Sequence, residues 1–407
     1  MRKKIYKGTA LDLIQTVHME NHVPIVYCYM ALDKAIDTDR LKQAVTRTAE
    51  IVPQILCRYN DLKNAWYPAE YDSHSVVKNV SAMNCYKDLV WDLRIDPQLR
   101  INVCHQDAGD ILHIGMSHIL TDGAGFQQYL ALLCKFYNEP DLPVSNEVNC
   151  RSIIPLLFQT ALQRLPRINK HIHKGNIPAF LPYDQDKGLL HSLKVTLSEE
   201  QLKMVQKKAK QLHVTLNDLF MAAYACALKA STLREEIILP CPADLRKYDR
   251  RNGNLTIANM TGKYLCHISL AKENRLREIA LAVHKEMEWQ KSRYSCFHQV
   301  PLLQILHAVL PNRVLRLAVR PLYSVEATSY TNMGTIDEHG VFFQGMSIKE
   351  CYLCGTYRQS PSFQVSISTY KNVCTLAANM LATEEQRISG MRLLKDMKSS
   401  LLCEFPS

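Results

Sequence analysis

The residues of this sequence that are best placed to do chemistry form an H-x-x-x-D-G element, made by His118, Asp122 and Gly123. Residues 111–117 alternate in a way that predicts a strand whose apolar face also carries the imidazole. Residues 126–133 place apolar side chains at helical spacing. We therefore expect the imidazole at the end of a strand, partly removed from water, where its neutral form is favoured and accepts a proton.

The residues that follow the imidazole suggest a tight start to the predicted helix. Asp122 is an acceptable N-cap, and Gly123 and Gly125 allow a close backbone at that point. A histidine four residues before an aspartate also occurs in many unrelated sequences, so the spacing alone does not establish catalysis. The strand, loop and helix around it favour the catalytic interpretation.

This segment resembles the active-site motif of the chloramphenicol acetyltransferase-like superfamily. That group includes condensation domains of nonribosomal peptide synthetases, plant alcohol acyltransferases and bacterial alcohol acetyltransferases. Condensation domains usually carry a second histidine before the catalytic one, and Ser117 occupies that place here. This departure favours a stand-alone acyltransferase over a peptide-synthetase module. The resemblance implies that His118 acts as a general base on a thioester, with no metal and no cofactor besides the donor substrate.

The resemblance continues in the second half of the chain, at residues 242–246 and 259–264. In the superfamily an arginine at the place of Arg246 pairs with the aspartate of the motif, here Asp122. A bidentate guanidinium would keep that carboxylate ionised and fix the turn. The alternative is that Arg246 belongs to a solvated basic cluster with its neighbours up to residue 251.

A second segment, Ser329, Thr331, Asn332 and Gly334, resembles the superfamily's Ser/Thr-Asn-x-Gly stretch that lines the shared tunnel. The resemblance implies that these residues bind substrate and offer a hydroxyl or amide to the acyl carbonyl. A plain turn at residues 332–334 is an equal alternative. The C-terminal DFGWG element of the plant enzymes is absent from the sequence.

Length and pattern predict two mixed lobes. The 407 residues exceed one compact core,. We predict an α/β fold, an α+β sandwich of two pseudo-symmetric chloramphenicol acetyltransferase-like lobes over residues 1–175 and 176–407, with the active site at their interface. A linker is expected within residues 139–190. The strands are expected at 23–33, 55–59, 99–104, 111–117, 192–197, 237–242, 323–328, 341–343, 363–369 and 374–380. The helices are expected at 37–49, 153–165, 215–228, 274–293 and 384–402, and after residues 125 and 198.

Composition narrows the function classes. The fractions of hydrophobic (47%) and charged (22%) residues are those of a globular protein,. No apolar run has the length of a membrane span, and the basic start lacks the apolar core of a signal peptide. The net charge of +10 is spread along the chain, without a nucleic-acid-binding motif,. This surplus would attract an anionic donor such as coenzyme A or an acidic carrier protein, or it is simply a solvated surface.

The cysteines indicate a reducing compartment. Fourteen are scattered through the sequence, many in apolar runs, so we expect free thiols and a cytoplasmic location,. The close pair Cys351 and Cys354 lacks a partner pair at zinc-ribbon spacing, and no metal site is expected.

Two functions of different classes follow. The favoured one is an acyltransferase that moves an acyl group from acyl-coenzyme A or an acyl-carrier protein to a hydroxyl or amine, with His118 as base. The alternative is a non-catalytic condensation-like module that binds a carrier protein or acyl ligand. The sequence leaves open the acyl length, the choice between ester and amide, the donor's carrier and the oligomeric state.

Overall fold

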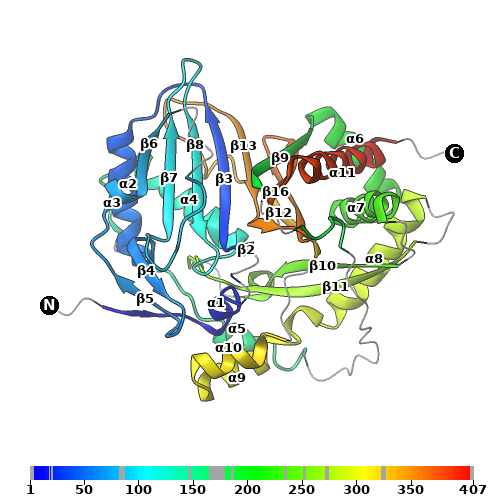
Figure 1. Cartoon of the computed structure of the whole chain (residues 1–407), viewed down its shortest axis with the longest axis horizontal. Coiled ribbons are helices and arrows are strands. Elements are labelled where there is room, and N and C mark those ends of the chain that lie inside the picture. Colours follow the sequence, from blue (N-terminus) through cyan, green and yellow to red (C-terminus); the bar gives the residue numbers. More distant parts are fainter. Residues whose placement is uncertain are drawn as a thin grey trace.

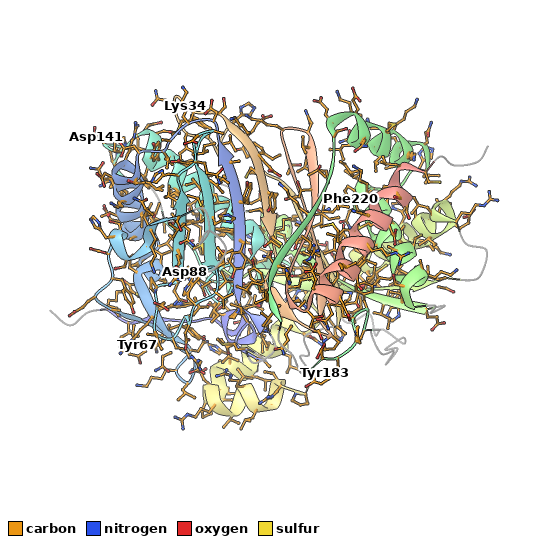
Figure 2. The ribbon with its side chains drawn as sticks, turned by 45° about the horizontal axis from the view of Figure 1, so that its top comes forward. Lys34, Tyr67, Asp88, Asp141, Tyr183 and Phe220 are labelled. Atoms are coloured by element: carbon orange, nitrogen blue, oxygen red, sulfur yellow. The ribbon has the colours of Figure 1, made fainter. Side chains whose placement is uncertain are left out.

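The computed structural model of the chain shows two halves side by side, each built on a sheet (Figure 1). It describes residues 4–17, 19, 22–81, 88–144, 148–164, 179–184, 188–232, 236–250, 254–270, 275–321 and 327–403. Charged side chains such as Lys34 and Asp141 stand at the periphery of one half, whereas Phe220 lies within the other (Figure 2).

The sheet of the first half has five strands in the order β13-β3-β8-β7-β6. They are β3 (Ile25–Leu32), β6 (Val77–Val80), β7 (Leu99–Cys104), β8 (Ile111–Ser117) and β13 (Ile348–Cys354). Strand β8 is antiparallel to β3, with Ile25 opposite Ser117, so the end of β8 lies at the start of β3. Helices α2 (Thr38–Ile51), α3 (Ser73–Val76) and α4 (Gly123–Asn138) complete this half.

The sheet of the second half follows the order β12-β15-β16-β14-β2, and β9 also pairs with β16. Its strands are β2 (His22–Val23), β9 (Leu189–Leu197), β12 (Thr328–Thr335), β14 (Tyr357–Gln359), β15 (Phe363–Tyr370) and β16 (Val373–Ala382). Its helices are α6 (Glu199–Gln211), α7 (Leu216–Thr232), α8 (Leu276–Ser292) and α11 (Glu384–Leu402).

The remaining elements join the halves or flank them. A long antiparallel hairpin consists of β10 (Glu236–Asp244) and β11 (Thr261–Ser269), and β1 (Tyr6–Lys7), β4 (Cys57–Asn60) and β5 (Ala65–Pro68) form a small sheet. Short 3-10 helices occur at η1 (Pro53–Leu56), η4 (Leu245–Tyr248) and η5 (Ser295–Phe297). Helices α1 (Ala10–Ile14), α5 (Ile154–Gln159), α9 (Val300–Val309) and α10 (Asn312–Val319) lie together at the lower edge of the view in Figure 1.

Two strands cross between the halves. Strand β13 comes from the second half of the sequence but pairs with β3, with Cys351 opposite Met30. Strand β2 pairs in return with β14 in the other sheet. The core of the first half also contains Ile336 and Phe343. The predicted boundary between residues 175 and 176 stays a prediction, because each sheet takes a strand from the far side of it.

Most predicted elements are present, and the exceptions have local causes. Residues 341–343 are not a strand; Val341 and Phe343 are buried in a looped segment instead, so their apolar pattern reflects burial alone. The strand expected from residue 55 begins at Cys57, because Pro53 opens η1. The helix expected at 153–165 ends at Gln159. The strand expected at 323–328 lies mostly outside the described residues, as does the basic run beyond Arg164.

The structure also bears on the expectations about free cysteines and membrane-spanning segments. Cysteines in the described part of the chain are free at twelve positions, but Cys104 is disulfide-bonded, which corrects the expectation of free thiols throughout. Within the described ranges, no helix is long and apolar enough to cross a bilayer.

Candidate active site

The backbone of His118 is fixed from two sides, directly after β8. Its N–H donates to the carbonyl of Pro24 at 2.7 Å, which continues the pairing with β3. Its own carbonyl accepts from the side-chain amide of Asn259 at 3.0 Å, and Asn259 lies just before β11 in the second half. The imidazole is therefore held between a strand of one half and a segment of the other.

The imidazole is placed to work as a neutral base. Its Nδ1 is buried and has no hydrogen-bond partner among the described residues. His118 also lines a cavity. Burial lowers the pKa of His118, and the negative charge of Asp122 only partly offsets this effect,. At neutral pH the ring is uncharged and able to accept a proton.

Both oxygens of the Asp122 carboxylate accept hydrogen bonds from groups other than the imidazole. Its Oδ1 accepts from the N–H of Gly125 at 2.9 Å, which caps α4. Its Oδ2 accepts from the N–H of Met260 at 2.7 Å, from the Thr261 hydroxyl at 2.8 Å and from Arg246 at 3.0 Å. Burial by itself raises the pKa of Asp122, but the Arg246 charge and these hydrogen bonds outweigh it and hold the pKa below its usual value,.

Arg246 uses all five of its N–H groups in this structure. Nη1 donates to Asp122 at 3.0 Å and to Asp244 at 2.9 Å, whereas Nη2 donates to the carbonyls of Thr256 and Ala258. Nε donates to Thr256. The guanidinium is 11% exposed, so it is not part of a solvated basic cluster. The expected bidentate contact is wrong, because only Nη1 meets the Asp122 carboxylate, through one oxygen, whereas Nη2 binds backbone carbonyls and Nε binds the Thr256 hydroxyl.

A second buried carboxylate, which the sequence analysis missed, supports the histidine loop. Asp12 of α1 accepts from the Asn259 amide at 3.0 Å and from Arg151 at 2.9 Å. The Arg151 guanidinium also donates to the carbonyls of Leu120 and Ile257. These groups lie far apart in the sequence and follow no motif spacing, so no pattern pointed to them. Together they tie α1 and the loop after β8 to the start of β11.

The predicted substrate-binding residues all lie along β12 and line the same cavity as His118. Ser329 is buried, and its hydroxyl has no hydrogen-bond partner among the described residues. Asn332 is committed elsewhere, since its amide donates to Asn217 and its carbonyl accepts from the N–H of Gly334. Gly334 has a φ of +78° at an irregularity in the pairing with β15. The segment is thus an irregular strand rather than a plain turn.

Strand β12 is attached to the start of α4. The Gln127 amide donates to the carbonyl of Met333, and a side-chain carbon added to Gly123 would lie 3.5 Å from Met333. Gln127 is another residue that the sequence analysis missed. This contact brings Thr331, on the same strand, into the cavity wall that faces the histidine loop.

The cavity has a volume of about 1510 Å³ and is walled by both halves. One wall, formed by β11 and α8, carries Lys263, Lys285 and Trp289. Another part of the wall, formed by α1 and α9, is mostly apolar and includes Ile14 and Leu306. The site therefore lies at the junction of the halves, where ligand pockets are common.

Other residues singled out in the sequence have structural positions. Ser117, in the place of a second histidine, is buried, and its hydroxyl has no partner among the described residues. His113 lies 5.1 Å from the ring of Tyr29, and burial lowers its pKa to about 4. Across the described residues, no group of three or more histidine, cysteine or acidic side chains is arranged to hold a metal ion.

Comparison with known proteins identifies the fold. No family model matches the sequence. Bacitracin synthase 3 of Bacillus licheniformis is 26% identical over 186 residues, which are 43% of this chain and 3% of that protein. The chain thus spans a small part of the length of the curated relative that it matches.

Solved structures match over almost the whole chain. The trichothecene 15-O-acetyltransferase of Fusarium sporotrichioides has a TM-score of 0.70 at 13% identity, covering 98% of this chain and 95% of that one. Polyketide synthase associated protein 5 of Mycobacterium tuberculosis has a TM-score of 0.69 at 13% identity, covering 98% and 99%. The first condensation domain of the CDA synthetase has a TM-score of 0.68 at 11% identity, covering 98% and 96%. The chain has the chloramphenicol acetyltransferase-like fold, as the sequence resemblance implied.

Replacing Asp122 with asparagine is expected to destabilise the protein by about 3–5 kcal/mol, because Arg246 is left buried beside a neutral group. Since the pKa of Asp122 is lowered in the folded state, its contribution is present above the unfolded pKa of about 3.9 and is lost as pH falls through the folded pKa,. Denaturant unfolding of wild type and Asp122→Asn between pH 3 and pH 7 measures the difference, which should shrink toward acid.

Asp244→Asn is the matched control, because Asp244 contacts the same Nη1 but is more exposed. We expect a loss of about 1 kcal/mol or less there. Equal losses of unfolding free energy in the two variants would show that the pair of Asp122 with Arg246 contributes no more stability than that of Asp244.

The two glycines near the N-terminus of α4 should differ. A side-chain carbon on Gly125 would lie 2.2 Å from the Thr121 hydroxyl oxygen and 3.0 Å from the Ala258 nitrogen, whereas Gly123 has room for one. The expectation that Gly123 serves a tight backbone is thus wrong; Gly125 has that role. We expect Gly125→Ala to lose about 1–3 kcal/mol and Gly123→Ala to unfold like wild type. Thermal unfolding of both variants decides this, and equal melting temperatures would contradict it.

Proposed function

We propose that the protein is an acyltransferase that moves an acyl group from a thioester donor to a hydroxyl or amine acceptor, with His118 as general base. The observation that carries this proposal is an imidazole whose pKa is lowered by burial, whose Nδ1 is enclosed, and whose residue lines a large cavity between the halves. The likeness in fold to an O-acetyltransferase and to condensation domains supports transferase chemistry in general.

The step needs one proton acceptor and no covalent enzyme intermediate. The acceptor O–H or N–H gives its proton to Nε2 of His118 as its oxygen or nitrogen attacks the thioester carbonyl carbon. The carbon–sulfur bond then breaks, and the departing thiolate takes the proton from the imidazolium to leave as a free thiol. The unpartnered hydroxyl of Ser329 is the side-chain donor that we assign to the carbonyl oxygen as it becomes negative,.

The two walls of the cavity suit the two substrates. Lys263, Lys285 and the exposed Lys247 lie on the side of β10, β11 and α8, where they would attract the phosphates of coenzyme A or of a carrier-bound phosphopantetheine,. The apolar wall of α1 and α9 would receive the acceptor. We propose that the donor is acyl-coenzyme A or an acyl-carrier protein in the cytoplasm, and that the protein needs no metal or further cofactor.

The second candidate is a module that binds a carrier protein or acyl ligand without transfer. The likeness in fold to condensation domains is the observation that supports this alternative. An intact His118, supported by buried groups from both halves, argues for transfer, because mere binding requires no base.

The deciding experiment follows free thiol release from acetyl- and longer acyl-coenzyme A and from a loaded carrier protein, with mixed alcohols and amines. We expect turnover with at least one donor, and an apparent donor affinity that falls with salt. His118→Ala should lower the rate about 10²–10⁴-fold. His298→Ala is the matched control, because this exposed imidazole lines the same cavity and should be dispensable.

Turnover with none of these donors would favour the binding module. A His118→Ala variant that keeps more than about a tenth of the wild-type rate, against the factor normally assigned to a base, would exclude His118 from that role.

The pH profile tests the state of the imidazole. Burial lowers the pKa of His118, so the base stays neutral and active to a pH below the ordinary histidine value of about 6.5,. We expect kcat/KM to be flat near pH 7 and to fall on the acid side at a pKa below about 6.5. An acid limb above that value would mean that the ring is not desolvated in the working enzyme.

A further inference from the structure

Helices α9 and α10 form an amphipathic hairpin at the edge of the molecule, away from both sheets (Figure 1). The inner side packs against α1 through Leu303, Leu306, Leu310, Leu315 and Val319. The outer side carries Leu302, Ile305, Val309, Val314 and Leu317, which are between 48% and 70% exposed. Scattered exposed apolar residues are normal, but five on one short hairpin indicate an interaction surface.

The charges on this hairpin are of one sign. Residues 299–321 contain no aspartate or glutamate, and they include Arg313, Arg316 and Arg320. Arg316 is paired with Asp61 at 3.0 Å, and the side chains of Arg313 and Arg320 are exposed. An aliphatic face bordered by arginines is typical of helices that lie in the interface of an anionic bilayer.

A protein partner fits this surface less well. The cores of protein interfaces are enriched in aromatic residues, methionine and arginine, and of these the hairpin has only arginine,. Residues 299–321 contain neither phenylalanine, tyrosine, tryptophan nor methionine. The outer side offers only branched aliphatic side chains, which enter the acyl boundary of a bilayer without needing a complementary shape.

The same hairpin forms part of the cavity wall. Val300, Leu302, Leu303, Leu306 and Val319 line it together with Leu11 and Ile14 of α1. Leu302 is among the exposed residues and also lines the cavity, so the apolar outer side continues into the apolar wall near the catalytic site.

We propose that the α9–α10 hairpin docks the protein on an anionic lipid bilayer and that an apolar acceptor reaches the cavity from the bilayer along α9. The docking stands by itself, whereas the path of the acceptor rests on the proposed acyl transfer. The acceptor class is then a lipid-soluble alcohol or amine, delivered to the apolar part of the cavity wall that α1 and α9 form.

Co-sedimentation of the full chain with vesicles tests the docking without any turnover. We use vesicles of phosphatidylcholine alone and vesicles with added phosphatidylglycerol. Wild type should bind the anionic vesicles, more weakly as salt rises. The triple variant Ile305→Ser, Val309→Ser and Leu317→Ser should bind at least about tenfold more weakly, because its aliphatic contact with the acyl boundary is lost.

The matched control removes exposed apolar residues elsewhere. Leu189→Ser with Ile388→Ser changes side chains that are 73% and 55% exposed on β9 and α11, and vesicle binding should be unchanged. The pair Arg313→Gln and Arg320→Gln should weaken binding to anionic vesicles but not to neutral ones. Circular dichroism and thermal unfolding of each variant confirm that the fold is retained.

Several results would overturn the proposal. Wild type that binds neither vesicle type, or a triple variant that binds as wild type does, would exclude docking. A concentration-dependent dimer that the triple variant abolishes, with no vesicle binding, would assign the surface to a second copy. Thiol release with a short water-soluble acceptor should be equal in wild type and triple variant, so loss of docking and loss of transfer are separately visible.

Discussion

The contact between Asp122 and Arg246 is the interaction on which the rest of the site depends. It joins the first turn of α4 in one half to the segment between β10 and β11 in the other. One oxygen of Asp122 accepts three hydrogen bonds. The Arg246 guanidinium donates to the backbone carbonyls of residues 256 and 258. Because both groups are buried and satisfied, the loop between His118 and α4 has one geometry. The position of His118 therefore depends on this pair, although its side chain forms no ion pair with Asp122 or Arg246.

The neutral form of the imidazole is favoured by burial. In a serine protease triad a carboxylate orients the histidine. Here the hydrogen bonds of the nearby Asp122 carboxylate go to other groups, and the backbone of His118 is held by Pro24 and Asn259. Desolvation sets its protonation state, so the same burial that fixes the ring also keeps it neutral.

Whether a feature of the site could be predicted from the sequence depends on how far apart in the sequence its interacting residues lie. The strand before His118, the cap at Asp122 and the helix after it depend on neighbours in sequence, and periodicity found them. The contact of Gln127 with Met333 and that of the buried Asp12 with Asn259 depend on segments more than a hundred residues away. No local pattern encodes those contacts. The apolar residues at 341–343 show the opposite error, a strand predicted where there is none. A buried loop segment can have the same apolar composition as a strand.

The exchange of strands between the halves has a consequence for how the chain is made. Strand β3 ends at Leu32, but its partner β13 begins only at Ile348, so roughly 300 residues separate the two sides of one ladder. At ribosomal rates this interval lasts on the order of 15–60 s, during which β3 presents an unpaired edge. Unpaired edges promote association between chains, and contacts this distant in sequence slow folding. The newly made first half is therefore a species that must be shielded until the last strands emerge.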